Sequence, residues 1–362
     1  MLAGRIGRTV AICTVFVLLV VLDRRWRNPL STGIARQFPC PAIKHATYDT
    51  GVSITAGTEY QIEELPDGTT RYQHSSKSAS SKPTLLILTL IKDGVSYGHD
   101  QGQSARTFED YLRLLLASGL DMTRVSLGLA IESRIESDHI MSKIKPLTTL
   151  EGVFPRFTLL LLPPHSSDLG REDRHQLTFE AQNTRRNRIA QLRNALTFSA
   201  LNTEPHVLWL DADVNHLSPN VIQTMLAHSA TNRDAAIITA RCQEGPTYDY
   251  DKNAWAGKRY PAGSAEVDTR RNVAELIKGT RSDDLIPLSS VGGTILLIRS
   301  SLMHAGLVFP AGAVIGKDWD RDGWDGIETE GLCVLARDLV GTKAGSVCWV
   351  LGGKHYVGHT NF

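Results

Sequence analysis

Short apolar runs that alternate with helical patterns constrain this chain more than any other feature. The strand-like runs cover residues 84–90, 125–131, 157–162, 207–210, 236–240, 294–298 and 347–351. The helix-like segments cover residues 104–118, 176–201, 221–230 and 328–339. Such alternation is typical of α/β proteins in which helices join parallel strands. We therefore predict a Rossmann-like, mainly parallel sheet flanked by helices, within one domain at 83–362.

Composition narrows the classes of function. The chain has 362 residues, of which 42% are hydrophobic and 21% charged, and its formal net charge is +1. A large core can therefore be buried, and the near-neutral charge argues against nucleic acid as the main partner. Five cysteines without a CxxC pair exclude a zinc site of that type and a disulfide-rich scaffold. Outside Cys13, four cysteines remain, and their three possible pairings stay open.

The N-terminus carries a hydrophobic targeting segment. Arg5 and Arg8 precede an apolar run at 10–22, which would span roughly 20 Å as a helix. This is shorter than the ~30 Å hydrocarbon core of a membrane, so a cleaved signal peptide remains an alternative to a short signal anchor. We favour the anchor and predict a cytosolic tail at 1–8, a membrane segment at 9–22 and a lumenal stem at 23–82.

Two carboxylates follow one of the predicted buried strands. The segment Val207-Leu208-Trp209-Leu210 leads directly into Asp211-Ala212-Asp213. In open α/β sheets, ligands bind beyond the carboxyl ends of the strands. Oxygen ligands at that point suit Mg²⁺ or Mn²⁺, which would neutralise a diphosphate leaving group. The alternative is a solvated acidic turn with no ligand. The sequence context favours the metal site.

Arginines and aromatic residues supply further candidates. The helical segment 182–194 places arginines on two stripes, one with Arg185 and Arg188 and one with Arg186 and Arg193. Arginine forks suit diphosphates, although a solvated basic face would give the same pattern. The segment 248–255 mixes tyrosine, aspartate, asparagine and tryptophan, as a carbohydrate-binding loop or an anchored surface turn would.

Three more motifs are ambiguous when taken alone. Val291-Gly292-Gly293-Thr294 would let backbone approach a ligand, or would make a plain turn. Glu328-Thr329-Glu330-Gly331 lies at a predicted helix start, where carboxylates also have a purely structural role. His355 and His359 become candidates only if the C-terminal segment returns to the metal.

In their order and spacing, these motifs resemble those of glycosyltransferase family 62, the fungal Golgi mannosyltransferases that form mannan polymerase complexes. The resemblance runs from about Leu85 to His359. It rests on the segments 88–92, 126–129, 182–194, 208–213, 248–255, 290–293, 328–331 and 355–359.

The resemblance implies a GT-A fold, GDP-mannose as donor, Mn²⁺ (or Mg²⁺) as cofactor and transfer with retention of anomeric configuration. It also implies roles for individual residues. The metal ligands would be Asp211, Asp213 and His359. The catalytic set would be Asp211, Asp213, Glu328 and Glu330. The nucleotide would contact Leu90, Lys92, Glu132, Arg185, Arg188 and Asp211. The acceptor would contact Asp249, Asn253, Trp255, Gly292 and Gly293.

The sequence therefore predicts a single-pass type II Golgi membrane protein whose lumenal domain transfers mannose from GDP-mannose to a mannan or N-glycan mannose acceptor. Partners would be related mannosyltransferase subunits in a hetero-oligomeric complex, and no nucleic acid. A non-catalytic scaffolding subunit is the main alternative. A sugar nucleotidyltransferase is disfavoured, because no glycine-rich phosphate loop follows Leu90.

Overall fold

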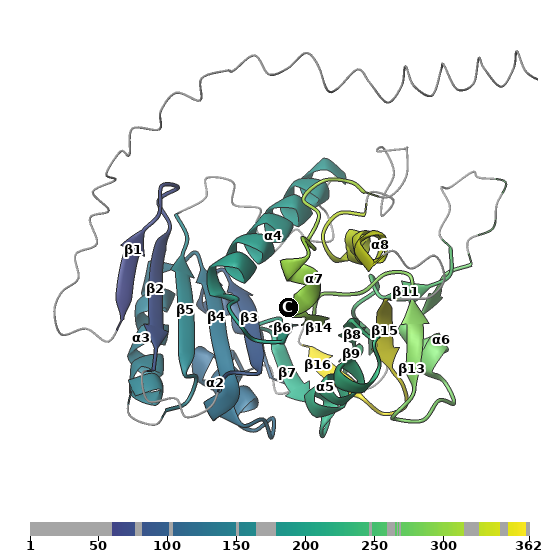
Figure 1. Ribbon diagram of the computed structural model, residues 1–362, viewed down its shortest axis with the longest axis horizontal. Coiled ribbons are helices and arrows are strands. Elements are labelled where there is room, and N and C mark those ends of the chain that lie inside the picture. The colour runs from purple at the N-terminus through teal and green to yellow at the C-terminus, as the bar shows by residue number, and fades with distance from the viewer. Residues whose placement is uncertain are drawn as a thin grey trace, which may run out of the picture. The chain divides into compact units, whose positions relative to one another are not determined.

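The fold is described from a computed structural model (Figure 1). The structure describes residues 60–76, 82–100, 104–149, 152–163, 179–245, 248–258, 265, 267, 269–314, 326–340 and 347–359. All of these belong to one compact unit, Val52–Phe362. The predicted cytosolic tail, membrane segment and first part of the stem lie outside the described residues. Within the described ranges, no helix combines the length and apolar character that membrane crossing requires.

Strands and helices alternate along the chain. The strands are β1 (Gln61–Glu64), β2 (Thr70–Ser75), β3 (Leu85–Ile91), β4 (Val125–Ile131), β5 (Arg156–Leu161), β6 (His206–Leu210), β7 (Val214–Leu217), β8 (Ile237–Thr239), β9 (Arg241–Glu244), β10 (Tyr248–Asp249), β11 (Trp255–Ala256), β12 (Arg271–Asn272), β13 (Leu285–Leu288), β14 (Ile295–Arg299), β15 (Cys348–Leu351) and β16 (Tyr356–His359). The α-helices are α2 (Phe108–Leu116), α3 (Arg134–Thr149), α4 (Phe179–Ala200), α5 (Val221–Thr231), α6 (Val273–Ile277), α7 (Ser300–His304) and α8 (Thr329–Val340). Two 3₁₀ helices are η1 (Gly94–Tyr97) and η2 (Met122–Arg124).

The main sheet has ten strands in the order β1-β2-β5-β4-β3-β6-β14-β8-β15-β13. Strands β5, β4, β3 and β6 are mutually parallel, and β15 is parallel to β8. The other five pairings are antiparallel. The prediction of a mainly parallel sheet is therefore wrong, because five of the nine pairings in this sheet are antiparallel. The misjudged pairings are those of β1 and β2 at one end of the sheet and most of those after β6.

The predicted boundary between stem and domain is also corrected. Strand β2 pairs with β5 over its whole length, and β1 pairs with β2. Tyr60 is buried, and its hydroxyl lies 2.6 Å from the hydroxyl of Thr148 on α3. The folded domain thus begins at least as early as residue 60. The stretch 61–75 is rich in polar residues because it forms an edge of the sheet, where one side of each strand faces water.

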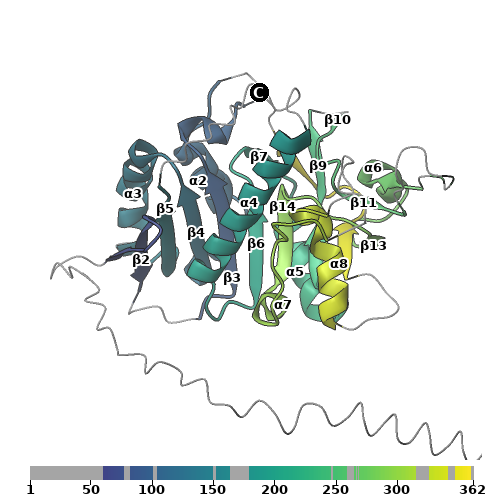
Figure 2. The same cartoon turned by 90° about the horizontal axis from the view of Figure 1, so that it is seen from above.

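Helices cover both faces of the main sheet (Figure 2). One core cluster joins Leu85, Ile87 and their neighbours to α2, α3 and α5. The other joins Leu86, Leu88 and their neighbours to α4, α6, α7 and α8. Successive residues of β3 point to opposite faces, so a continuous apolar run serves both clusters. The result is a three-layer α/β domain.

A smaller sheet brings the C-terminal strand to the carboxyl end of β6. Its order is β10-β9-β16-β7. Strand β16 runs antiparallel to β7 and parallel to β9, and His359 pairs with Val214. Because Val214 directly follows the Asp211-Ala212-Asp213 segment, this register carries His359 to the predicted metal site.

A disulfide ties α8 to the main sheet. Cys333 on α8 bonds to Cys348 on β15, with 5.9 Å between the Cα atoms. This resolves one of the pairings that the sequence left open. Cys242 on β9 is a buried free thiol.

Candidate functional site at the carboxyl end of β6

The site is built around the turn that ends β6. Residues 207–210 are buried on both sides, because β6 lies between β3 and β14 in the middle of the sheet. At Asp211 the chain leaves the sheet, and the Asp211 N–H donates to the carbonyl oxygen of Thr294 at 3.0 Å. The Val214 N–H donates back to the Asp211 carbonyl at 3.2 Å. This tight turn presents both aspartates at the carboxyl edge of the parallel strands.

Arg193 of α4 links Asp211 to Glu328. Its Nη2 lies 3.3 Å from Oδ1 of Asp211, and its Nε lies 3.0 Å from Oε1 of Glu328. The guanidinium carbon is 4.8 Å from the ring centroid of Trp209 and 5.4 Å from that of Phe309. Arg193 is buried, and aromatic faces favour a guanidinium in such a position. A single buried cation therefore holds two of the predicted catalytic carboxylates.

Glu328 and Glu330 both point toward arginines of α4. Glu328 adopts a left-handed backbone conformation with φ 61°, which is costly for a residue with a side chain. Glu330 accepts from Nη2 of Arg186 at 2.9 Å. Arg186 also donates to the carbonyl oxygen of Ile327 at 2.7 Å. The start of α8 is thus fixed to α4 through buried charges, and Glu328 shares Arg193 with Asp211.

Asp213 is paired with His359. Nε2 of the histidine lies 2.9 Å from Oδ2 of Asp213, and both side chains are buried. The imidazole stacks on the ring of Tyr250, with centroids 3.6 Å apart and planes 17° apart. Beneath this pair, Arg106 donates to the carbonyl oxygen of Val214 at 2.9 Å. The C-terminal strand therefore completes the site, as the prediction for His359 required.

The charges in the site perturb one another. Burial raises the pKa of Asp211 well above its usual range, and Asp213 acts in the same direction while the Arg193 cation opposes both. About a third of the Asp211 side chain remains open, so this direction reflects the dense protein surroundings rather than complete loss of water. Burial disfavours the charged form of His359, but Asp213, Asp211 and Asp251 outweigh it and raise the pKa of the imidazole.

These residues fit a divalent cation that is shared with a ligand. The buried Nδ1 of His359 has no hydrogen-bond partner among the described residues. Asp213 touches the same imidazole, and Asp211 offers a partly open carboxylate. In the described ranges, no group of three or more His, Cys, Asp or Glu could hold a metal unaided. A cation bound by one or two side chains and by substrate phosphates needs no such group.

The 248–255 segment packs against the same turn. Oδ2 of Asp251 accepts from the N–H of Thr294 at 3.4 Å and from its hydroxyl at 3.2 Å. A Cβ on Gly292 would lie 1.7 Å from this oxygen, and a Cβ on Gly293 would lie 2.5 Å from Nη2 of Arg193. A larger residue at either glycine would therefore displace the carboxylate or the guanidinium from its present contacts.

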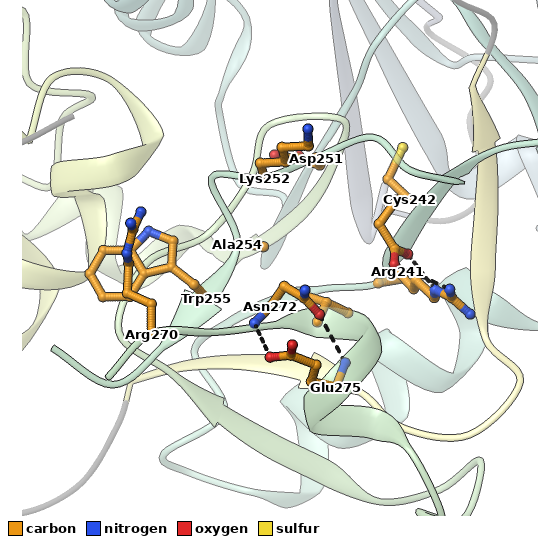
Figure 3. A pocket seen from close by; sticks show the side chains of 12 residues that line it. Arg241, Cys242, Asp251, Lys252, Ala254, Trp255, Arg270, Asn272 and Glu275 are labelled. Atoms are coloured by element: carbon orange, nitrogen blue, oxygen red, sulfur yellow. Dashed lines mark hydrogen bonds and ion pairs between the residues drawn. The ribbon is translucent and has the colours of Figure 1, made fainter. Parts of the chain in front are cut away.

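A cavity of about 340 Å³ opens beside this segment (Figure 3). Trp255 and Arg270 lie on one side of it, and Arg241 and Cys242 lie on the other (Figure 3). Its remaining lining residues are Ala240, Asp249, Asp251, Lys252, Ala254, Asn272, Val273 and Glu275. Its volume is at the lower end of the roughly 300–1,000 Å³ typical of ligand pockets.

The predicted acceptor residues occupy three positions around the cavity. Asp249 and Trp255 line the cavity, whereas Gly292 and Gly293 lie beside Asp251 and Arg193. The side chain of Asn253 is not part of the lining. Its backbone N–H donates to Oδ1 of Asp251 at 3.2 Å. The acceptor prediction therefore joins residues that lie in and next to one hollow.

The predicted nucleotide residues occupy the neighbouring part of the sheet edge. Leu90 lies near the end of β3, Lys92 follows β3 and Glu132 follows β4. Since β3, β4 and β6 are parallel, all three residues lie at the edge that carries Asp211. Arg185 and Arg188 lie on the stripe of α4 other than the one that contacts the acidic residues, and their role stays a prediction.

Sequence reasoning missed several contributors. The sequence placed Arg193 and Arg186 on one face of the helix, because their spacing of seven residues is two helical turns. It did not indicate that this face contacts the acidic residues. Asp251 and Tyr250 were within the predicted loop but received no role. Arg106 had no local signal, because only the tertiary fold brings it beneath Val214.

Fold and site together define a three-layer α/β protein with an acidic site at the carboxyl edge of its sheet, where arginines of α4 pair with carboxylates. The chain belongs to the Anp1 family, whose model matches residues 68–313. It is 25% identical over 306 residues to mannan polymerase complex subunit mnn9 of Schizosaccharomyces pombe, covering 78% of this chain and 82% of that protein. It is 26% identical over 247 residues to mannan polymerase complex subunit MNN9 of Candida albicans, covering 60% of this chain and 64% of that protein. The predicted resemblance to mannan polymerase-type subunits is confirmed.

Solved structures give more distant similarities. The S. aureus TarS 1–349 structure matches with a TM-score of 0.41 and 11% identity, covering 76% of this chain and 60% of that chain. The mannosyltransferase PcManGT from Pyrobaculum calidifontis, in complex with GDP-Man and Mn²⁺, matches with a TM-score of 0.41 and 9% identity, covering 79% of this chain and 59% of that chain.

Proposed function

We propose that this chain is a metal-dependent, retaining mannosyltransferase of the GT-A type that moves mannose from GDP-mannose to a mannan or N-glycan mannose acceptor. The observation that carries the proposal is the meeting of Asp213 and His359 beside Asp211, at the carboxyl end of β6. Ligands of open α/β sheets bind at this edge. Membership of the Anp1 family, with relatives named as mannan polymerase complex subunits, supports the mannose chemistry.

The chain's own residues divide the work of holding the donor. Asp213, with one or both of its neighbours Asp211 and His359, would hold the cation, Mn²⁺ or Mg²⁺, together with the donor's phosphates, and the cation would supply positive charge to the departing diphosphate. Arg193 keeps Asp211 and Glu328 in fixed positions, so that neither carboxylate has to reorganise during the reaction. Lys92 and other groups at the ends of β3 and β4 would face the nucleoside.

The acceptor would approach from the cavity of Figure 3. Trp255 offers an apolar face for a sugar ring, and Asp249 and Asn272 offer hydrogen-bonding groups for its hydroxyls. Asp251 separates this cavity from the Asp211 turn, because it lines the cavity and also binds Thr294. A sugar in the cavity would therefore lie next to the place where the donor is held. Glu328 and Glu330 would face the reacting sugar.

Location and assembly belong to the same proposal. A disulfide between Cys333 and Cys348 is stable in an oxidising compartment, which supports a lumenal domain. The apolar run at 10–22 would then be the anchor of a type II Golgi membrane protein. The names of the relatives support a role within a complex of related subunits.

A donor screen tests the proposal. The full-length chain would be given GDP-mannose, UDP-glucose or UDP-galactose with mannobiose and Mn²⁺, and labelled product would be measured. We expect transfer from GDP-mannose alone, its loss on chelation, and its loss in Asp213→Asn. Asp138→Asn, at an exposed position on α3, is the matched control and should keep full activity. Transfer only from UDP-sugars would overturn the donor, and pyrophosphate release would instead indicate a nucleotidyltransferase.

A non-catalytic subunit is the second candidate. The observation that favours it is that Asp211 already has a buried counter-ion in Arg193, so that it can be satisfied without a metal. In that case the assembled complex would transfer mannose equally well with wild-type chain and with Asp213→Asn. Loss of transfer in the complex that carries the variant would rule this candidate out.

A further inference from the structure

A second hollow lies next to the cavity of Figure 3 and shares Arg241 with it. Its volume is about 270 Å³. Its lining consists of Arg241, Gln243, Gly353, Lys354, His355 and Tyr356. Apart from the shared arginine, none of these residues borders the first cavity. The two hollows are called the first and the second cavity below.

The residues at the junction of the two cavities lie on paired strands rather than on loops. Arg241 and Gln243 are on β9, Asp249 is on β10 and Tyr356 is on β16. In the ladders of this small sheet, Arg241 pairs with Tyr356 and Gln243 pairs with Asp249. Side chains on paired strands hold their spacing better than side chains on loops.

Arg241 is fixed at the junction by a two-point ion pair. Its Nε lies 2.5 Å from Oδ1 of Asp249, and its Nη2 lies 3.3 Å from Oδ2. Each side chain remains about a quarter exposed. Because the carboxylate neutralises the guanidinium, the junction offers directed hydrogen bonds to a ligand without a strong net charge.

The chemistry of the second cavity suits hydroxyl groups. Gln243 and Lys354 bring an amide and an ammonium group to the lining, and no carboxylate is part of it. Burial and the nearby His228 lower the pKa of His355, so this imidazole is mainly neutral at pH 7. The ring of Tyr356 stacks on His216, with centroids 5.2 Å apart, and is therefore held in place. Donors beside a fixed aromatic ring are what a sugar needs.

We propose that the two cavities form one groove that binds successive sugars of a mannose oligosaccharide. The reacting end lies in the first cavity and the next part of the chain lies against Gln243, Lys354 and Tyr356. This inference rests on the proposed function. The order along the groove follows from Asp251, which borders the first cavity and binds Thr294, whose carbonyl in turn accepts from Asp211.

Calorimetric titration of the full-length chain with mannobiose and with mannotetraose tests the groove. We expect the tetrasaccharide to bind about tenfold more tightly, since one or two additional net hydrogen bonds have roughly that effect. Gln243→Trp fills the second cavity and should reduce tetrasaccharide affinity to that of mannobiose, while mannobiose binds as before. Gln73→Trp, a half-buried glutamine on β2, is the matched control and should leave both affinities unchanged. Lys354→Ala should act like Gln243→Trp but more weakly, with exposed Lys82→Ala as its control.

Two results would overturn the groove. Equal affinity of the wild-type chain for both oligosaccharides would do so, and so would a Gln243→Trp variant that loses affinity for both to the same extent. Transfer measured on the same samples separates this inference from the proposed function. If binding depends on length but no transfer occurs, the groove stands and the proposed transferase function fails. If transfer occurs with the same KM for both acceptors, the transferase function stands and the groove fails.

Discussion

The two halves of the main sheet are built in different ways. On one side, next to the antiparallel edge strands β1 and β2, strands β5, β4, β3 and β6 are parallel, and helices that follow them in sequence cover them. On the other side, β14, β8, β15 and β13 come from segments scattered between residues 237 and 351, and most of their pairings are antiparallel. The first group is called the parallel half below, and the second is called the mixed half.

The site lies at the seam between these halves. Asp211 belongs to the end of the parallel half, and its backbone is bonded to Thr294, which precedes the first strand of the mixed half. His359 and Glu328 also arrive from the C-terminal part of the chain. The comparison teaches that the parallel half supplies a rigid edge, whereas long-range pairing in the mixed half completes the chemistry. Equivalent changes in the two halves should therefore have different consequences.

The largest expected effect comes from removing one of two ion-paired arginines, Arg193 at the seam or Arg156 within the parallel half. Arg193→Met leaves Asp211 and Glu328 without their cation, and Arg156→Met leaves the buried Glu204 without its own. Each variant should lose about 3–5 kcal/mol of unfolding free energy, the usual consequence of breaking a buried ion pair. Urea denaturation measures this loss. Only Arg193→Met should also weaken Mn²⁺ binding in the presence of GDP. Equal weakening in both variants would show that the seam and the interior of the parallel half do not differ in function.

The disulfide gives the next effect and belongs to the mixed half alone. Replacing both Cys333 and Cys348 with serine should destabilise the protein by about 3 kcal/mol, as expected for a closed loop of roughly 15 residues. Denaturation of the double variant, compared with wild type under oxidising and reducing conditions, measures it. Reduced wild type should match the variant. An unchanged stability on reduction would contradict the pairing.

Glycine substitutions compare the two halves at smaller cost. A Cβ on Gly128 of β4 would lie 2.5 Å from Leu88 and 3.1 Å from Ala200, so Gly128→Ala should lose about 1–3 kcal/mol through overpacking. Gly292→Ala meets only the flexible carboxylate of Asp251, which can rotate away and abandon Thr294. It should lose less stability but more transferase activity than Gly128→Ala. Gly312→Ala is the control, because nothing lies near its Cβ. A reversed order of the two activities would contradict the seam.

The smallest effect is a pH dependence in the parallel half. Hydrogen bonding to Lys143 lowers the pKa of Glu109 to about 2, with a further contribution from His139 and some opposition from burial. The unfolded carboxyl binds its proton near the ordinary value of 4.5, so the pair stabilises above that pH and the stabilisation is lost as pH falls toward 2. Glu109→Gln should reduce the loss of unfolding free energy between pH 5 and pH 3, by less than about 1 kcal/mol. Acid titration of both proteins checks it, and an identical slope would contradict the pair.

The sequence predicted the parallel half well because its signals are local. The predicted runs at 125–131 and 207–210 and the helix at 176–201 match β4, β6 and α4 almost to the residue. Helix α3 was missed because its amphipathic pattern is weak and it contains Pro146. Strands β9 and β16 were missed because their short polar segments gain strand structure only by pairing within the small sheet, β9 with β10 and β16, and β16 with β7 and β9.

The site was predicted from a motif and a resemblance, and its supporting groups were not. His359 pairs with Asp213, and Asp211 lies two residues earlier in the same turn, while their role as metal ligands stays a prediction. No local pattern could indicate that Arg193 rather than Arg188 would face Asp211, because the rotation of α4 about its axis depends on the packing of its apolar face on the sheet. The same holds for Asp251, whose role depends on the close approach that Gly292 permits.

Mn²⁺ binding in the presence of GDP tests the central claim most directly. The full-length chain and Asp213→Asn would be titrated with Mn²⁺ while the free ion is followed by electron paramagnetic resonance. We predict saturable binding by wild type and a loss of Mn²⁺ affinity in the variant. Removing a residue that only hydrogen-bonds to a metal ligand lowers metal affinity roughly 10–100-fold, and the loss in Asp213→Asn should exceed this. Binding of Mn²⁺ by Asp213→Asn with the affinity of wild type would contradict the account.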